Sequence, residues 1–230
     1  MSNVAIITAR GGSKRIPRKN IRDFCGKPII AYSIDAAVKS GLFDEVMVST
    51  DDEEIADISR RYGAKVPFYR SAETSNDYAT TMDVLKEVVS VYEERGQYFD
   101  YMCCIYPTAP FVTPEKLHRG YDQLINSGLD MMIPVVKFEC PPQWGLTIGE
   151  DGFLKYCTPE YVNVRSQDLE PLYHDAGQFQ WYNIEQCCHS SKNNLDITTI
   201  ILPEIEVQDI DNESDWEMAE LKYRLLNHNK

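Results

Sequence analysis

Long apolar segments are missing from this 230-residue sequence. No run approaches the ~20 uncharged apolar residues that a bilayer-spanning helix needs, which excludes an integral membrane protein of the helical type. The first residues, MSNVAIITARGG, contain no basic leader, and their apolar run is too short for a signal peptide. We therefore expect a cytoplasmic protein.

Common cysteine patterns and several familiar signatures are also missing. The seven cysteines are odd in number and include no CxxC spacing, so the sequence favours reduced, packed thiols over a zinc site or a disulfide framework. The sequence contains no GxxxxGKS/T, GxGxxG or HExxH motif. These absences exclude a Walker-type phosphate loop, a dinucleotide-binding fingerprint and a HExxH zinc site.

An overall positive charge is absent too. The 23 Lys and Arg residues against 36 Asp and Glu residues give a net charge of −13, which argues against nucleic acid or an anionic membrane as the main partner. Residues 1–27 are the exception, because they contain seven basic residues and one acidic residue. A cationic cluster on an otherwise acidic body indicates one small anionic ligand.

Short apolar runs alternate with helical patterns along much of the chain. Val4 to Ala9 is a continuous apolar run, which is typical of a buried central strand. Further strands are expected at 45–49, 66–69, 101–106, 131–136, 180–184, 197–202 and 205–210, and helices at 28–40, 53–62, 80–94, 114–126 and 214–226. The alternation predicts an α/β fold with a doubly wound, mostly parallel sheet, in one domain over residues 1–230.

Residues 138–180 interrupt this alternation. Prolines and aromatic residues crowd the stretch, and most of it shows no helix-length period. We expect it to leave the sheet as hairpins and loops with exposed aromatic side chains, and such surfaces often form interfaces. A homodimer is therefore expected.

The turn after the first strand is the first candidate site. It reads ARGGSKRIPRKN, residues 9–20. In open parallel sheets, ligands bind beyond the carboxyl ends of the strands. Gly11 and Gly12 would let backbone N–H groups face an anion, while Arg10, Lys14 and Lys19 would supply countercharge. The stretch predicts a phosphate-binding loop, and a tight turn with basic residues on the surface is the alternative.

An acidic pair near the C-terminus is the second candidate site. Asp209 and Asp211 lie two residues apart in VQDIDNESDW, so on an extended segment both carboxylates can face one cation. Mg²⁺ takes a few carboxylates together with substrate phosphates. The two candidates together predict a site for a magnesium-bound nucleoside triphosphate. The alternative is that Asp211 or Ser214 caps the last helix.

Six motifs resemble those of the acylneuraminate cytidylyltransferase family, whose members activate sialic acids with CTP. They are ARGGSKRIPRKN (9–20), STDD (49–52), RSAE (70–73), PTAP (107–110), RSQDLEP (165–171) and QDID (208–211), and the likeness covers nearly the whole chain. Residues 165–179, which contain RSQDLEP and HDAGQF, most resemble the branch that acts on pseudaminic acid. The resemblance implies a Rossmann-like nucleotidyltransferase fold in which residues 138–180 form a dimerisation and sugar-binding excursion.

The resemblance also implies roles for individual residues. Arg10, Lys14, Lys19 and Asp211 would be catalytic, and Asp209 and Asp211 would bind magnesium, with manganese as an alternative. Arg70 and Thr80 match positions that hold the cytosine and neighbouring nucleotide groups, and Arg165 matches a sugar-carboxylate contact that would serve the neighbouring subunit's site. The full set of implied substrate contacts is Gly11, Gly12, Ser13, Asn20, Arg70, Thr80, Tyr106, Arg165, His174 and Gln178.

The implied reaction joins CTP to a nine-carbon α-keto sugar acid with release of pyrophosphate. Tyr106 and His174 stand where sialic acid members have glutamine and arginine, which favours a substrate other than N-acetylneuraminate. CMP-N-acetylneuraminate and CMP-legionaminate synthetases are the alternatives within the family. A glycosyltransferase is an alternative of another class, since Asp209-Ile210-Asp211 is formally a DxD motif, and a nucleotide sensor without turnover is the third.

Overall fold

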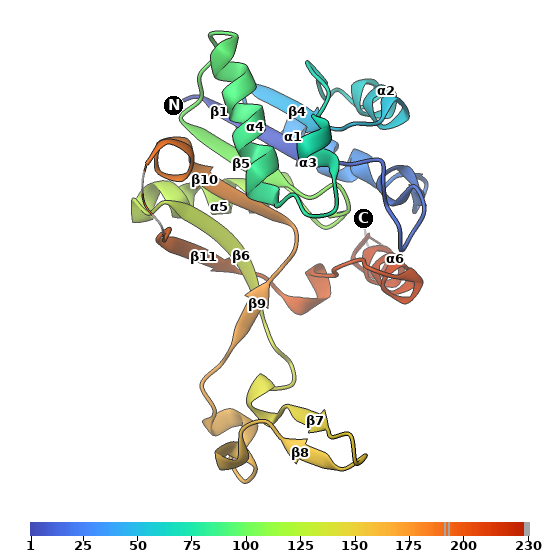
Figure 1. The fold of residues 1–230 in the computed structure, drawn as a ribbon, viewed down its shortest axis with the longest axis vertical. Coiled ribbons are helices and arrows are strands. Elements are labelled where there is room, and N and C mark those ends of the chain that lie inside the picture. The colour runs from blue at the N-terminus through green and yellow to red at the C-terminus, as the bar shows by residue number, and fades with distance from the viewer. Residues whose placement is uncertain (191, 193, 228–230) are drawn as a thin grey trace.

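A seven-stranded sheet forms the centre of the computed structural model, which describes residues 1–190, 192 and 194–227. The strands run in the order β11-β6-β10-β5-β1-β4, and β9 pairs with β6 outside that path (Figure 1). Their bounds are β1 Asn3–Thr8, β4 Glu45–Ser49, β5 Tyr101–Ile105, β6 Met131–Lys137, β9 Tyr173–Asp175, β10 Phe179–Asn183 and β11 Ile197–Ile201. β1 is parallel to β4 and β5, and β11 is parallel to β6, whereas β10 is antiparallel to both of its neighbours. The predicted mostly parallel sheet is confirmed.

Helices cover both faces of this sheet (Figure 1). They are α1 Ile30–Ser40, α2 Glu53–Arg61, α3 Ala72–Ser75, α4 Thr81–Glu94, α5 Pro114–Ser127 and α6 Glu213–Asn227. In β1, Val4 and Ile6 pack in the same core cluster as Leu85 of α4, whereas Ala5 and Ile7 pack in the cluster that contains Ile34 of α1. Both faces of β1 are therefore buried, which explains its uninterrupted apolar sequence. None of the described helices combines the length and apolarity that a membrane span needs.

Two predicted strands are wrong. Residues 66–69 form no strand, and the chain there makes only an isolated bridge between Lys65 and Met47. Pro67 lacks a backbone N–H, so this stretch cannot continue a ladder. Residues 205–210 are also unpaired: a 3₁₀ turn, Glu204–Glu206, follows Pro203, and the chain then turns toward the first loop. The remaining predicted helices and strands agree with the structure to within two residues at either end.

The excursion leaves the sheet at the end of β6 and returns at β9. Within the range 138–180, residues 173–175 and 179–180 belong to β9 and β10 of the main sheet, so the part that projects from the body is 138–172. It contains a hairpin, β7 Leu146–Ile148 with β8 Leu154–Tyr156, and three 3₁₀ turns at 142–144, 159–161 and 166–168. Figure 1 shows this part extending away from the sheet along the long axis of the molecule.

Candidate active site

The first loop lies where several parallel strands end. Residues 9–20 follow β1, Thr50 to Asp52 follow β4, and Tyr106 follows β5. Because these strands are parallel neighbours, their carboxyl ends meet at one edge of the sheet, where α/β proteins bind ligands. Ala9 continues the ladder by donating its N–H to the carbonyl of Ser49 at 2.9 Å. The first loop therefore begins beside Thr50 to Asp52, which lead into α2.

Gly11 is packed tightly against the beginning of α2. Its N–H donates to Asp51 Oδ1 at 2.8 Å, and a Cβ at Gly11 would lie only 2.8 Å from Asp52 Oδ2 and 3.0 Å from Asp52 Cβ. Asp52 cannot easily move aside, because it caps α2 by accepting from Ile55 N at 3.0 Å. It also accepts from Arg18 at 2.5 Å. At Gly12 a Cβ would meet no described atom within 4 Å.

The cations of the loop are paired with carboxylates from distant parts of the chain. Arg10 donates to Asp77 at 2.8 Å, and Lys14 binds the other oxygen of the same carboxylate. Hydrogen bonds from Lys14 and Arg10 lower the pKa of Asp77 below its ordinary value. Arg15 pairs with Asp211 at 2.8 Å. These partners are exposed to water, so an incoming anion such as a phosphate can compete for the cations.

A cavity of about 250 Å³ lies beside Arg10, between the end of β1 and α4. Arg70 and Thr80 both line it. Arg70 is buried and donates to Ser49 Oγ at 3.0 Å and to the Ser49 carbonyl at 2.8 Å. Burial lowers the pKa of Arg70, and Asp51 and Glu87 act against that shift. Thr80 caps α4 in a capping box with Asp83, which fixes one wall of the cavity.

The two aspartates line a second cavity, of about 360 Å³, together with His174. The idea that Asp211 or Ser214 caps the last helix is wrong, because Asn212 Oδ1 accepts from Asp215 N at 3.1 Å. The Asp215 carboxylate in turn accepts from the N–H of Asp211 at 2.9 Å. The Asp211 carboxylate is therefore not used by the helix cap, and it faces Arg15 instead.

The first loop and the aspartate segment meet directly. Lys19 Nζ donates to the carbonyl of Ile210 at 2.7 Å, between the two aspartates, and Arg15 reaches Asp211. Burial lowers the pKa of Lys19, while the negative charges of Asp211 and Asp209 raise it. The predicted meeting of these two stretches, which are about as far apart in sequence as the chain allows, is confirmed.

The donor set of this segment fits a hard divalent cation that is completed by its substrate. Two carboxylates two residues apart face one cavity, and the described residues contain no cluster of three or more His, Cys, Asp or Glu side chains able to hold a metal alone. Mg²⁺ commonly takes one or two carboxylates and fills its other positions with phosphate oxygens and water. Asp209 and Asp211 have the right chemistry for that arrangement.

Four other predicted residues belong to the segments around these cavities but line neither of them. Asn20 donates to the Arg10 carbonyl at 2.9 Å, so its side chain holds the loop in shape. Tyr106 is mostly buried, and burial raises its pKa. Gln178 is buried and donates to the Glu206 carbonyl at 2.6 Å, just before the aspartates. Ser13 stays within the turn, where its N–H donates to the Gly11 carbonyl at 3.0 Å.

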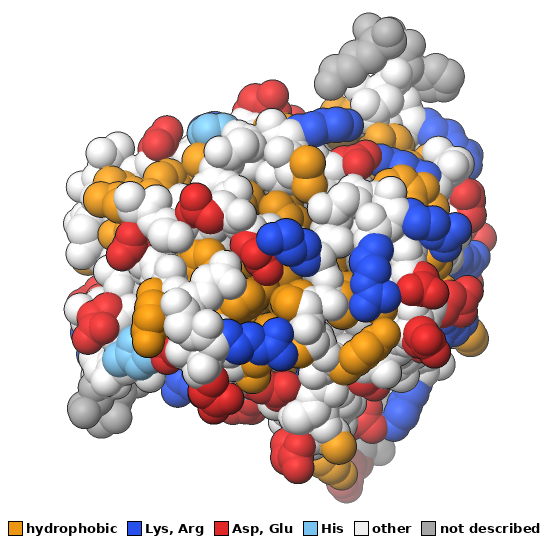
Figure 2. All heavy atoms as spheres, turned by 90° about the horizontal axis from the view of Figure 1, so that it is seen from above, with side chains coloured by type: hydrophobic (Ala, Val, Ile, Leu, Met, Phe, Trp, Pro, Cys, Tyr) orange, Lys and Arg blue, Asp and Glu red, His pale blue; other side chains and the backbone are white. Residues whose placement is uncertain are grey.

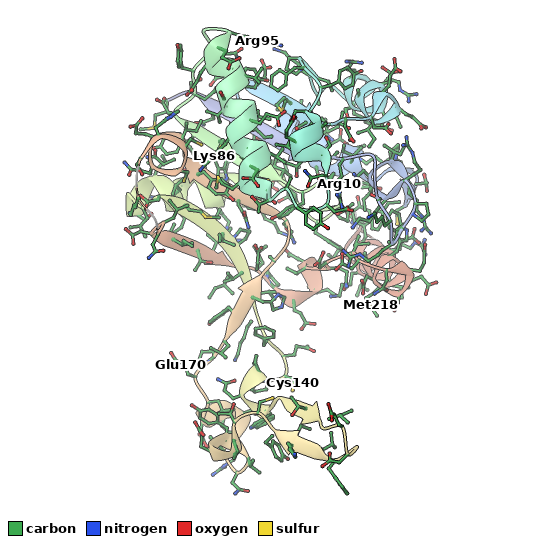
Figure 3. All side chains as sticks on the ribbon, viewed as in Figure 1. Arg10, Lys86, Arg95, Cys140, Glu170 and Met218 are labelled. Carbon is green, nitrogen blue, oxygen red and sulfur yellow. The ribbon has the colours of Figure 1, made fainter. Side chains whose placement is uncertain are left out.

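Arg165 is the predicted residue that the fold does not bring to the others. It lies on the projecting part of the excursion, its side chain is 78% exposed, and its ionic partner is Asp168 at 3.7 Å. Figure 3 places Arg10 on the body, whereas Cys140 and Glu170 at the base of the excursion lie well below it along the long axis. Arg165, within the excursion, is thus separated from Arg10 of its own chain.

A larger cavity than these two lies elsewhere. It has a volume of about 640 Å³ and is lined by residues of α1, the start of α5 and the end of α6, including Lys39, Arg119 and Tyr223. None of the predicted site residues lines it. The two smaller cavities bring together Arg10 of the loop, the buried arginine and the acidic pair, so they form the candidate active site.

Comparison with known protein families identifies the family to which the chain belongs. A family model described as cytidylyltransferase matches residues 4–197. The chain belongs to the cytidylyltransferase family. It is 39% identical to the pseudaminic acid cytidylyltransferase of Campylobacter jejuni, over 99% of this chain and 98% of that protein. It is also 32% identical to the CMP-N,N'-diacetyllegionaminic acid synthase of Legionella pneumophila, over 96% and 95% of the two chains. The family predicted from the six motifs is confirmed.

Solved structures support the same fold at much lower identity. CMP:2-keto-3-deoxy-manno-octonic acid synthetase complexed with CTP matches the whole length of both chains, with a TM-score of 0.72 and 17% identity. The 4-diphosphocytidyl-2C-methyl-D-erythritol synthase of Anaerococcus prevotii covers 97% of this chain and 98% of its own, with a TM-score of 0.63 and 15% identity. The predicted Rossmann-like nucleotidyltransferase fold of this cytidylyltransferase is confirmed.

Sequence reasoning missed Asp77 and the significance of Arg15. Asp77 accepts from both Arg10 and Lys14 across more than sixty residues, and no local pattern around SNDY signals such a contact. Arg15 could have been singled out, because it is basic and lies in the candidate loop. Its pairing with Asp211 depends on how residues 204–211 pass the first loop, which the sequence does not reveal.

The contrast between the two glycines of this cytidylyltransferase loop is testable. We expect Gly11→Ala to lower the free energy of unfolding by about 1–3 kcal/mol, because the added methyl group overpacks against Asp52. Gly12→Ala has space, and its effect should stay within about 1 kcal/mol, in the stabilising direction. Urea denaturation of both variants measures the difference. Equal stabilities for the two variants would contradict the close approach at Gly11.

Proposed function

We propose that this protein is a pseudaminic acid cytidylyltransferase, which uses CTP to form CMP-pseudaminic acid and pyrophosphate. The observation that carries the proposal is the contact between the first loop and the aspartate segment, through Lys19 to Ile210 and Arg15 to Asp211. It stands in a chain that resembles a named pseudaminic acid cytidylyltransferase over nearly the full length of both proteins. The relative that makes a CMP-legionaminic acid is less similar.

The reaction is an in-line displacement at phosphorus. The C2 hydroxyl of the sugar acid attacks the α-phosphorus of CTP, the bond from that phosphorus to the bridging oxygen breaks, and pyrophosphate leaves with the bond electrons. Catalysis of such transfers is mainly positioning and charge stabilisation. Arg10 and Lys14, now paired with Asp77, would exchange that carboxylate for phosphate oxygens and stabilise the leaving pyrophosphate.

The aspartates would complete this charge balance. Asp209 and Asp211 would hold the divalent cation, Mg²⁺ or Mn²⁺, which neutralises phosphate charge and lowers the pKa of the attacking hydroxyl. Arg15 must then leave Asp211, and it lies in the loop from which it can turn toward the phosphates. Lys19 would stay between the first loop and the aspartate segment, because its Nζ donates to the Ile210 carbonyl.

The nucleotide and the sugar acid would occupy the two cavities. We assign the cytidine to the cavity beside Arg70 and Thr80, where Arg70 offers a buried cation and the capped start of α4 forms a rigid wall. Gly12, Ser13 and Asn20 would shape the loop around the phosphates. The sugar acid would lie on the side of the aspartates, near His174. In this arrangement the C2 hydroxyl would lie beside Asp209 and Asp211.

The sugar end of the site would be completed by a second copy of the chain. The projecting excursion exposes large apolar side chains that a monomer would leave in water; they include Leu146, Ile148, Phe153, Leu154 and Tyr156. Arg165 cannot readily serve its own chain's cavities from there, but it can serve those of a partner. We therefore assign the projecting residues 138–172 to dimerisation and Arg165 to the partner's sugar carboxylate. On the face seen in Figure 2, at the end of the body away from the excursion, acidic and basic side chains are interspersed.

Substrate choice is tested by a panel of free nonulosonic acids. We expect pyrophosphate release with CTP, Mg²⁺ and pseudaminic acid, and turnover at least tenfold lower with legionaminic or N-acetylneuraminic acid. Release of pyrophosphate also separates this activity from a glycosyltransferase, which would consume a nucleotide-sugar, and from a sensor, which would bind CTP without turnover. A preference for legionaminic acid would contradict the proposal and favour a CMP-legionaminate synthetase.

The role of the charged groups is tested by substitution. Asp211→Ala and Arg10→Ala should each lower kcat at least a hundredfold, because one preorganised charge contact in such a site contributes on the order of 3–4 kcal/mol. Glu213→Gln is the matched control. Glu213 lies two residues after Asp211, is exposed to solvent, and pairs with Arg22. Circular dichroism checks that all three variants fold. Near-normal turnover in Asp211→Ala would remove that residue from the mechanism.

Sharing of sites between subunits is tested by mixing two inactive variants. Arg165→Ala and Asp211→Ala should each be inactive alone. Mixed dimers have one complete site, built from the intact Asp211 of one chain and the intact Arg165 of the other. After equilibration, random pairing should restore roughly a quarter of the wild-type activity. The same samples should have the mass of a dimer by light scattering. No recovery in a mixture proven to contain mixed dimers would contradict the assignment of Arg165.

A further inference from the structure

The segment that carries the two aspartates is held by side chains instead of by a sheet. Among the described residues, 204–211 pair with no strand. Buried backbone carbonyls need hydrogen-bond partners, and here the partners come from elsewhere in the fold. Val207 and Ile210 are buried, so the segment is pinned by two apolar side chains, with Asp209 and Asp211 beside them.

Three side chains supply the missing hydrogen bonds to this segment. Gln178 donates to the Glu206 carbonyl at 2.6 Å, and Lys19 donates to the Ile210 carbonyl at 2.7 Å. Lys222 of α6 donates to the Val207 carbonyl at 2.8 Å, with a second, longer contact to the Glu204 carbonyl at 3.4 Å. Lys222 is the one of the three that the sequence did not single out.

Lys222 is well placed to fix the aspartates. It lies on a helix that is itself anchored, because Trp216 and Tyr223 of α6 pack edge-to-face on Phe24, with ring centroids 5.5 Å apart in both pairs. Its side chain lines the same cavity as Asp209 and Asp211. The bond to the Val207 carbonyl fixes the backbone two residues before the first aspartate, between the points that Gln178 and Lys19 hold.

We infer that Lys222 is a positioning residue for metal-dependent binding of the nucleotide. The inference rests on the proposed function, in which Asp209 and Asp211 share a cation with the triphosphate. Mg²⁺ demands near-ideal geometry with ligands at about 2.0–2.1 Å, so a small shift of the segment separates the two carboxylates from one cation. Loss of the Lys222 ammonium leaves the Val207 carbonyl without that donor and frees this part of the segment to move.

The test compares CTP binding with and without Mg²⁺ in the full-length protein. Isothermal titration gives the dissociation constant for CTP in excess Mg²⁺ and again in EDTA, with no sugar acid present. In Lys222→Met, the gain in affinity that Mg²⁺ provides should fall at least fivefold, while the affinity in EDTA changes less than twofold. Lys222→Arg keeps a cationic donor and should retain most of the gain.

Arg224→Met is the matched control on the same helix. Arg224 pairs with Glu220 one turn earlier and is exposed, so the gain from Mg²⁺ should be unchanged. An unchanged gain in Lys222→Met would overturn the inference, and so would an equal loss of affinity in Mg²⁺ and in EDTA together with a lower melting temperature, which indicates a general structural effect. Failure of the wild-type protein to bind CTP at all would instead overturn the proposed function, and this inference with it.

Discussion

The contact between Lys19 and the Ile210 carbonyl joins the two ends of the active site. Lys19 lies in the loop after β1, and Ile210 belongs to a segment that has no strand partner among the described residues. The ammonium is withdrawn from water, and this cost is partly offset by the nearby negative charges of Asp211 and Asp209. Together with the pairing of Arg15 and Asp211, this cation sets the distance between the acidic pair and the first loop.

The protein's own carboxylates balance its cationic loop. Asp77 stands opposite Arg10 and Lys14, and Asp211 stands opposite Arg15. Exposed ion pairs of this kind contribute only about 0–1 kcal/mol each, so exchanging them for a triphosphate costs little. The acidic body therefore tolerates a concentrated cluster of basic residues before the substrate arrives. It also explains how a protein with a net charge of −13 can bind a strongly anionic nucleotide.

Much of the fold could be predicted from the sequence because its signals are local. The apolar run of β1, Pro114 at the start of α5 and Gly41 after α1 mark elements whose ends agree with the structure to within two residues. Local periodicity does not reveal long-range strand pairing. It therefore could not predict that β10 is antiparallel or that residues 66–69 and 205–210 form no strands. In the site, the loop and the acidic pair could be found from their residue types. Asp77, Lys222 and the pairing of Arg15 with Asp211 could not, because they depend on contacts across the folded chain.

The position of β10 has a consequence for how the chain folds. Residues 179–183 fill the gap between β5 and β6 in the middle of the sheet, and they come after the whole excursion in sequence. Until the ribosome has delivered them, the growing chain has two open strand edges facing each other, and such edges readily pair with other molecules. Contacts that close long loops form slowly. The nascent polypeptide is thus most exposed to aggregation while the excursion is being synthesised, and the sheet becomes continuous only when this late strand is inserted.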